Sequence, residues 1–312
     1  MDAPAVLLTL VATIPLPGVD GRIDHLSADP KRNRLFVAAL ANNTVEVVDL
    51  KAGQRIRSLG GFEKPQGVLF LPKNNRLVVA NGGNGRVDVL DAAAGYVPLT
   101  RLHFKSDADN IRFDPFTDEV LIGHGDGAVA ILDAGTGIER RHISLPAHPE
   151  SFQLLPQERL LFINLPEAAE IAVADPDRMQ IVSHWPNPEG QSTNHAMAVD
   201  PEQGRVFVAY RTPARLATLQ AKSGKMLSNI ELCGDSDDLF YDLKFKRLYS
   251  ICGDGFVDVF DAGSPGKERR IARISTAPHA RTGLFVRESG RLIVAVPAQG
   301  GRKARLLVFK RS

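Results

Sequence analysis

The feature that most constrains this chain of 312 residues is one sequence unit that occurs seven times, at spacings of 41 to 45 residues. Each unit has a polar cluster, an apolar run of strand length, a turn that is often Asp-Pro, and a second apolar run. In the third unit, the cluster DADN at 107–110 precedes an apolar run, the turn Asp114-Pro115 and the run VLI at 120–122. A repeat period of this length is typical of propellers and solenoids. One column of aligned polar residues runs through the units: Asp24, Gln66, Asp109, Glu150, His195, Asp237 and Arg281.

Two further strands follow in the units, and they decide the architecture. A third apolar run, such as 45–48 or 87–90, alternates apolar and polar residues, and a more polar fourth run follows it, as at 54–59. Four strands in about 43 residues is the period of a propeller blade. The last unit supplies only three strands, so residues 6–14 are expected to complete it and close the ring. The sequence therefore predicts an all-β fold, a seven-bladed β-propeller with four antiparallel strands per blade, as one domain over 1–312 with blade cores starting near 22, 64, 107, 148, 193, 235 and 279.

Charge and hydropathy exclude some classes of function. Lys and Arg total 38 against 36 Asp and Glu, a net charge of +2, so no nucleic-acid partner is expected. No apolar run approaches the roughly 20 residues of a membrane-spanning helix, so no membrane insertion is expected.

The compartment stays open between two interpretations. The apolar start at 6–12 lacks the basic region and cleavage site of an intact signal peptide, so the chain begins either at a native cytoplasmic start or as the mature part of an exported protein. Cys233 and Cys252 should lie near the same face of the sixth blade. A disulfide, which would favour a periplasmic or secreted protein, and two unpaired thiols are both compatible with that placement.

The polar clusters predict where a site lies. In a propeller the first strand of each blade lines the central channel, so clusters at the starts of those strands meet at one mouth of the channel. Polar residues there need only water, and Asp often closes tight turns. A ring of facing carboxylates, however, raises local negative potential unless a cation or base compensates it. We therefore expect a ligand site at this mouth.

Several chemistries fit these residue types. Oxygen ligands suit Ca²⁺ or Mg²⁺ and added His suits Zn²⁺, so a divalent metal is a candidate cofactor. Its candidate ligands are Asp109, Glu150, His195, Asp237 and Asp238. The metal could polarise a carbonyl or activate water, and His148 and His195 are the candidate general bases. The remaining candidates for binding a small-molecule ligand are Arg22, Asp24, His25, Asn110, Arg211 and Arg281, whose arginines could also hold an anion.

The motifs also resemble a known family. The blade pattern, with RLFVA at 34–38 and RVFVA at 205–209, resembles the YVTN-repeat or YncE-like bacterial β-propellers over essentially the whole chain. RIDHL, PQGV, DADN, HPESF, DDLFYD and ART are similar to motifs of one bacterial subgroup. The resemblance implies the fold and, for many members, export to the periplasm. It implies no single chemistry, because a fold does not determine function.

Three functions follow as hypotheses. The first is a propeller that binds a small molecule or a metal ion at the channel mouth. The second is a metal-assisted hydrolase or lyase at the same place, similar to lactonase-type propellers. The third is a scaffold that binds a protein partner across that face.

Overall fold

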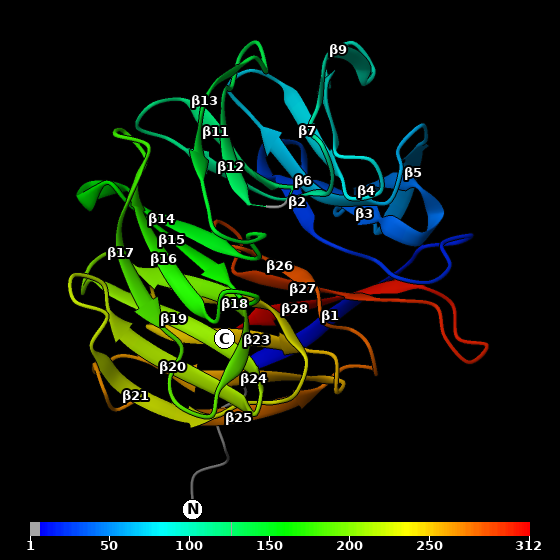
Figure 1. Cartoon of the computed structure of the whole chain (residues 1–312). Coiled ribbons are helices and arrows are strands. Elements are labelled where there is room, and N and C mark those ends of the chain that lie inside the picture. The colour runs from blue at the N-terminus through cyan, green and yellow to red at the C-terminus, as the bar shows by residue number, and fades with distance from the viewer. Residues whose placement is uncertain (1–6, 126) are drawn as a thin grey trace, which may run out of the picture.

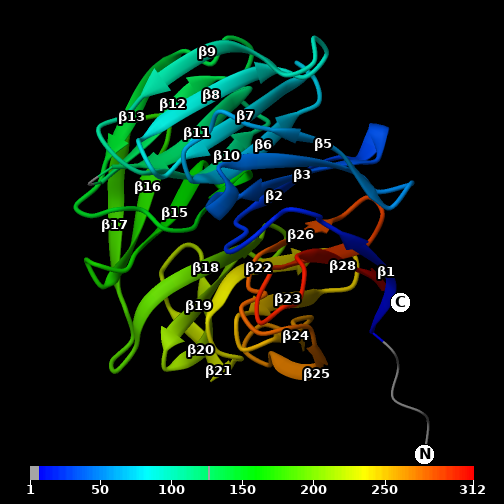
Figure 2. The same ribbon diagram turned by 90° about the vertical axis from the view of Figure 1, so that its right-hand side faces the viewer.

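The computed structural model describes residues 7–125 and 127–312. Its strands form seven four-stranded antiparallel sheets, the blades of a propeller arranged in a ring (Figure 1). Figure 2 shows blades 1 to 4 in the upper half of the ring and blades 5 to 7 in the lower half. The prediction of a seven-bladed all-β propeller is confirmed.

The first four blades follow the order of the chain from the channel outward. Blade 1 is β2 (Leu26–Asp29), β3 (Arg34–Ala39), β4 (Thr44–Asp49) and β5 (Gln54–Leu59), and blade 2 is β6 (Pro65–Leu71), β7 (Arg76–Asn81), β8 (Arg86–Asp91) and β9 (Val97–His103). Blade 3 is β10 (Ala108–Asp114), β11 (Glu119–His124), β12 (Ala128–Asp133) and β13 (Glu139–Ser144). Blade 4 is β14 (Phe152–Leu155), β15 (Leu160–Leu165), β16 (Glu170–Asp175) and β17 (Gln180–Pro186).

The last three blades include the closure of the ring. Blade 5 is β18 (Ser192–Asp200), β19 (Arg205–Thr212), β20 (Ala214–Gln220) and β21 (Met226–Glu231), and blade 6 is β22 (Ser236–Asp242), β23 (Arg247–Cys252), β24 (Phe256–Asp261) and β25 (Arg269–Ser275). Blade 7 is β26 (Gly283–Val286), β27 (Arg291–Val296), β28 (Arg305–Arg311) and β1 (Leu8–Pro15). Three short 3-10 helices lie in turns: η1 (Pro30–Arg32), η2 (Leu40–Asn42) and η3 (Pro156–Glu158).

The N-terminal strand closes the ring as expected. β1 pairs antiparallel with β28 from Leu8 opposite Arg311 to Pro15 opposite Arg305, and Figure 1 shows the blue strand beside the red one. Residue 6, the first of the predicted closing strand, lies outside the described residues.

Hydrophobic packing joins each blade to the next. Seven buried apolar clusters occupy the seven seams between neighbouring blades. At the seam of blades 1 and 2, for example, Phe36 stacks on Phe70 with ring centroids 5.3 Å apart. Packing of this kind fixes each blade, and therefore the start of each inner strand, relative to its neighbours.

The third strands differ from their expected pattern. Their alternation predicts one polar, solvated face, but the structure buries the polar residues as well: Glu46, Asp88 and Asp258 are each at most 1% exposed. Each of these carboxylates instead pairs with arginine, as Glu46 does with Arg55 of the outer strand at 2.9 Å. A buried charge needs such a partner.

The polar clusters are also built differently from the expectation. The sequence predicts that the polar clusters precede the inner strands. In the structure, four inner strands begin inside the clusters, and their pairing with the next strand shifts register there: β6, β10, β18 and β22. A bulge of this kind turns side chains away from the regular alternation of the strand. The residues just before or at these bulges all have positive φ angles, which are uncommon for residues other than glycine: Lys64, Asp107, Thr193 and Asp235.

Of the two states that the sequence leaves open for the cysteines, the structure has the disulfide. Cys233 and Cys252 are bonded, with Cα atoms 5.8 Å apart. Cys252 is opposite Ser236 in the pairing of β22 with β23, so the disulfide lies just behind the sixth polar cluster.

Candidate functional site

The polar clusters of the inner strands converge on one cavity of about 380 Å³ at the channel mouth. We call this cavity the mouth. Of the residues that the sequence singles out, Asp238 alone is not part of its lining and lies on the channel side instead. The mouth is lined by Arg22, Asp24, His25, Gln66, Asp107, Asp109, Asn110, His148, Glu150, Ser151, Glu167, His195, Arg211, Asp237 and Arg281.

One side of the mouth is a closed network of two arginines and two carboxylates. Arg211 Nη2 donates to Asp237 Oδ1, and Arg211 Nε lies 3.4 Å from Asp235 Oδ1. Arg281 donates to Asp235 Oδ1 at 3.0 Å and lies 2.9 Å from Asp237 Oδ2 through Nε. Burial would raise the pKa of Asp237, but the two guanidinium groups hold it below its usual value. The two positive and two negative charges of this side therefore balance.

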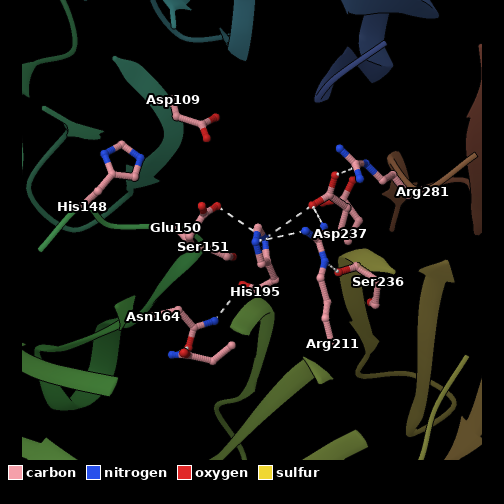
Figure 3. Close-up of polar contacts among 12 residues, drawn as sticks. Asp109, His148, Glu150, Ser151, Asn164, His195, Arg211, Ser236, Asp237 and Arg281 are labelled. Atoms are coloured by element: carbon pink, nitrogen blue, oxygen red, sulfur yellow. Dashed lines mark hydrogen bonds and ion pairs between the residues drawn. The ribbon is translucent and has the colours of Figure 1, made fainter. Parts of the chain in front are cut away.

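His195 lies between that network and the acidic side of the mouth (Figure 3). Its Nε2 faces Arg211 Nη1 at 3.0 Å, and its Nδ1 lies 3.4 Å from Glu150 Oε2. Asn164 Nδ2 donates to the backbone oxygen of His195 at 2.7 Å and so fixes the strand beneath it. Burial and the nearby Arg211 lower the pKa of His195 to about 4, so the ring is neutral near pH 7.

His25 has the opposite charge state. Burial alone would lower its pKa, but Asp238, Asp24 and Asp109 raise it to about 10. His25 Nδ1 is 3.5 Å from Asp238 Oδ1, and Asp24 is paired with Arg22 at 2.8 Å. The mouth thus contains a second group of balanced charges at blades 1 and 6.

Four carboxylates of the mouth remain without a Lys or Arg partner. Within the described part of the chain, Asp107, Asp109, Glu150 and the loop residue Glu167 have no Lys or Arg nitrogen within 4 Å. The first three have a histidine neighbour instead: His148 Nε2 is 3.7 Å from Asp107 Oδ2, and His25 Nε2 is 4.0 Å from Asp109 Oδ1. The third neighbour, beside Glu150, is the neutral His195, whereas His25 beside Asp109 is protonated. The negative charge of the mouth is therefore least compensated at blades 3 and 4.

The pKa values of these carboxyl groups reflect that excess. Burial, and then the neighbouring Asp24, raise the pKa of Asp109 to about 6. Burial, and then Asp109, raise the pKa of Glu150 to about 7. Burial also raises the pKa of Asp107. Carboxyl groups titrating so close to neutrality need either protons or a bound cation.

Unsatisfied acceptors lie at the same place. Asp107 Oδ1, Asp109 Oδ1 and Asn110 Oδ1 are buried and accept no hydrogen bond from any described residue. Buried polar atoms are normally paired, and unpaired ones in a native fold require an explanation such as a ligand or water. All three belong to one short segment of blade 3, at the bulge that starts β10.

His148 faces the mouth with one nitrogen. Its Nδ1 lies 2.7 Å from the backbone oxygen of Gly125, so Nδ1 carries the proton and donates. Nε2 faces Asp107 and the cavity. Of the two predicted general bases, His148 has one nitrogen directed into the cavity beside Asp107, whereas the ring nitrogens of His195 face Arg211, Glu150 and Asp237.

The candidate metal ligands are distributed over the three groups described above. Asp237 belongs to the arginine network, Asp238 accepts from Gly283 N at 2.8 Å, and Asp109 and Glu150 lie on the acidic side. Across the described ranges, no group of three or more His, Cys, Asp or Glu side chains has an arrangement that could hold a metal ion.

The polar clusters of the sequence place Asp107, Asp235 and Ser151 at the mouth without giving them a binding or catalytic role, and Glu167 lies outside those clusters. Asp107 and Asp235 lie two residues before the aligned column, at positive φ, and their side chains reach the mouth or its arginines. Their signal was present, since both begin acidic clusters. Ser151 follows Glu150 directly, whereas Glu167 comes from a loop outside the repeat pattern.

Comparisons with known proteins support the fold and leave the family open. No protein-family model matches the chain, and no curated protein matches it by sequence. Among solved structures, the chain is similar to Kuenenia stuttgartiensis hydrazine synthase, with 16% identity and a TM-score of 0.81 over 92% of this chain and 95% of that chain. At this identity the similarity concerns the fold alone. No helix among the described residues is long and apolar enough to cross a membrane.

Proposed function

We propose that the mouth binds a small cationic ligand, an organic amine, at the acidic side formed by blades 3 and 4. The observation that carries this proposal is the set of three carboxylates, Asp107, Asp109 and Glu150, that lack Lys or Arg partners among the described residues. An ammonium group would supply both the missing positive charge and several N–H donors.

The unpaired acceptors favour a ligand that donates hydrogen bonds. Asp107 Oδ1, Asp109 Oδ1 and Asn110 Oδ1 accept nothing within the described structure, and an ammonium group has up to three N–H donors to offer. An anionic ligand fits the mouth less well than a cation, because Arg211 and Arg281 already pair with Asp235 and Asp237. Carboxylate and amide oxygens also suit a hard divalent cation, so Ca²⁺, Mg²⁺ and Zn²⁺ belong in the same test.

Calorimetric titration tests the proposal with matched ligands. 1,4-Diaminobutane should bind and 1,4-butanediol, of similar length without charge, should not. Asp109→Asn and Glu150→Gln should each weaken amine binding about tenfold, which corresponds to about 1.4 kcal/mol. Glu139→Gln, on the outer strand β13, is the control and should bind like the wild type.

Three results would contradict the proposal. Equal heats from the amine and the diol would mean that charge is not recognised. Amine binding that survives in both Asp109→Asn and Glu150→Gln would place the ligand elsewhere. If a divalent metal bound and the amine did not, the ligand of these oxygens would be a metal ion and not an amine.

A second candidate function is hydrolysis at the same site, and one observation favours it. Glu150, with a pKa of about 7, and His148, with a nitrogen open to the cavity, have properties of an acid and a base that work near neutral pH. A panel of lactones and esters, assayed with and without added divalent metal, tests this. Activity unchanged in both His148→Asn and Glu150→Gln would exclude these residues.

We also propose a family and a compartment for the protein. The RLFVA and RVFVA runs at 34–38 and 205–209 support membership of the YVTN-repeat, YncE-like propellers. The disulfide between Cys233 and Cys252 supports an oxidising compartment such as the periplasm. Thiol labelling of the protein in cells tests the compartment, because a cytoplasmic protein would keep both thiols reduced.

A further inference from the structure

Below the mouth, the central channel contains a second cavity of about 270 Å³ whose lining comes from the inner strands of all seven blades. The two cavities share His25, Ser151 and Asp237 in their linings, so the second one continues the channel inward from the mouth. Its wall combines apolar side chains, including Leu26, Met197 and Leu239, with polar ones such as Gln153. One arginine, Arg112 of β10, lies on this wall.

Arg112 has no direct counter-ion. No carboxylate oxygen of the described chain lies within 4 Å of its guanidinium nitrogens. Its Nη1 donates to the backbone oxygen of Ile111 at 2.8 Å, and its Nη2 donates to Ser151 Oγ at 3.3 Å. The guanidinium group also lies 5.6 Å from the ring centre of Phe152. A guanidinium has five N–H donors, so this cation enters the cavity with donors still available.

The two carboxylates of the cavity are already engaged. Asp237 is held by Arg211 and Arg281 from the mouth side. Asp238 accepts from Gly283 N at 2.8 Å and lies 3.5 Å from His25, which is protonated near neutral pH. The positive charge of Arg112 is therefore compensated only at longer range, by Asp238 and Asp109, at a partly buried position where a poorly compensated charge is costly.

From this geometry we propose that the channel cavity binds a small monovalent anion, a halide, at Arg112 and Ser151. Arg112 would supply the charge and the free N–H groups. Ser151 Oγ accepts from Arg112, so its own hydroxyl hydrogen is available to donate to the anion. Ser151 lines both cavities, but the proposed amine site uses the carboxylates of the mouth and not Arg112, so neither proposal depends on the other.

The first test is the effect of chloride on thermal unfolding at constant ionic strength. Replacing gluconate with chloride should raise the melting temperature of the wild type. The rise should disappear in Arg112→Gln and persist in part in Arg112→Lys, which keeps the charge without the planar donors. Arg287→Gln, an exposed arginine on the same lining, is the control and should keep the full effect.

The second test locates the anion and does not need a variant to fold. Crystals soaked in bromide should show an anomalous peak within hydrogen-bond distance of Arg112 and Ser151. Equal chloride effects in the wild type and Arg112→Gln, or loss of the effect in Arg287→Gln alone, would overturn the proposal. Bromide peaks only elsewhere on the molecule would overturn it as well.

Discussion

The Nη1 atom of Arg211 lies 3.0 Å from Nε2 of His195, and this contact sets the chemistry of the centre of the mouth. A guanidinium group can only donate hydrogen bonds, so Nε2 must accept and the ring proton must sit on Nδ1. That proton then points toward Glu150 and Asp237, 3.4 and 3.6 Å away. His195 is thus a neutral bridge between the acidic side of the mouth and the arginine network.

Removing Arg211 should change the charge state of His195. In the wild type its pKa is lowered to about 4 by burial and by Arg211. In Arg211→Gln the carboxylates Asp235 and Asp237 remain near the ring and the positive charge is gone. The pKa of His195 should therefore rise by at least about one unit, equivalent to about 1.4 kcal/mol. Titration of the ring resonances by NMR measures the pKa of His195. An unchanged value would show that burial, and not Arg211, sets this pKa.

Glu150 should make stability depend on pH. Its folded-state pKa of about 7 lies above the ordinary value of 4.5, so the folded chain binds a proton more tightly than the unfolded chain. The free energy of unfolding should therefore fall as pH rises from about 4.5 to 7. Glu150→Gln removes this dependence and should be more stable than the wild type by about 1 to 3 kcal/mol at pH 8.

The measurement is denaturant unfolding of both proteins at several pH values. The two curves should converge near pH 4.5, where Glu150 is protonated in the wild type as well. Glu139→Gln should follow the wild type throughout, since Glu139 is on an exposed outer strand. A constant difference between wild type and Glu150→Gln at all pH values would mean that packing, and not ionisation, separates them.

How far the sequence predicts this molecule differs between the fold and the site. The repeat places Asp24, Asp109, Glu150 and His195 in one column, and in a propeller such a column must meet at the channel, so the location of the site follows from spacing. The pairing of side chains within the site does not follow from the spacing. Arg211 and Asp237 come from different blades, and their contact depends on the bulge at β22, which adds residues to a strand without changing the repeat period.

Arg112 shows the opposite case, a residue that stands out in the sequence itself. It interrupts the apolar run of its inner strand, where charge is unexpected. The spacing of residues cannot reveal that Asp237 and Asp238 already pair with other groups, because those contacts depend on side-chain orientation across four blades.

A buried ion network should anchor blade 5 to blade 6. Arg205, 1% exposed, contacts Asp200 Oδ2 at 2.7 Å and Glu268 Oε1 at 2.9 Å. Arg205→Met would leave both buried carboxylates unpaired and should lower the free energy of unfolding by about 3 to 5 kcal/mol. Adding Glu268→Gln should restore part of the loss. Arg178→Met, at a surface ion pair, should stay within about 0.5 kcal/mol.

The last prediction concerns Gly67, which allows blade 2 to approach the acidic side of the mouth. A Cβ atom on Gly67 would lie 2.0 Å from the backbone oxygen of Asp109 and 2.7 Å from Ile111 Cγ1. Gly67→Ala must therefore displace β10, because the closest atom is backbone and cannot rotate away. We expect a loss of about 1 to 3 kcal/mol in unfolding free energy. We also expect weaker amine binding, because Asp109 and Asn110 would move with the strand.

The matched control is Gly60→Ala. A Cβ at Gly60 meets no atom within 4 Å and its backbone is not left-handed, so neither stability nor binding should change beyond the small effect of replacing glycine. Calorimetric titration and denaturant unfolding of both variants separate two roles for Gly67. If Gly67→Ala lost stability but bound 1,4-diaminobutane like the wild type, the close contact would matter only for packing, and the position of Asp109 would not control the ligand.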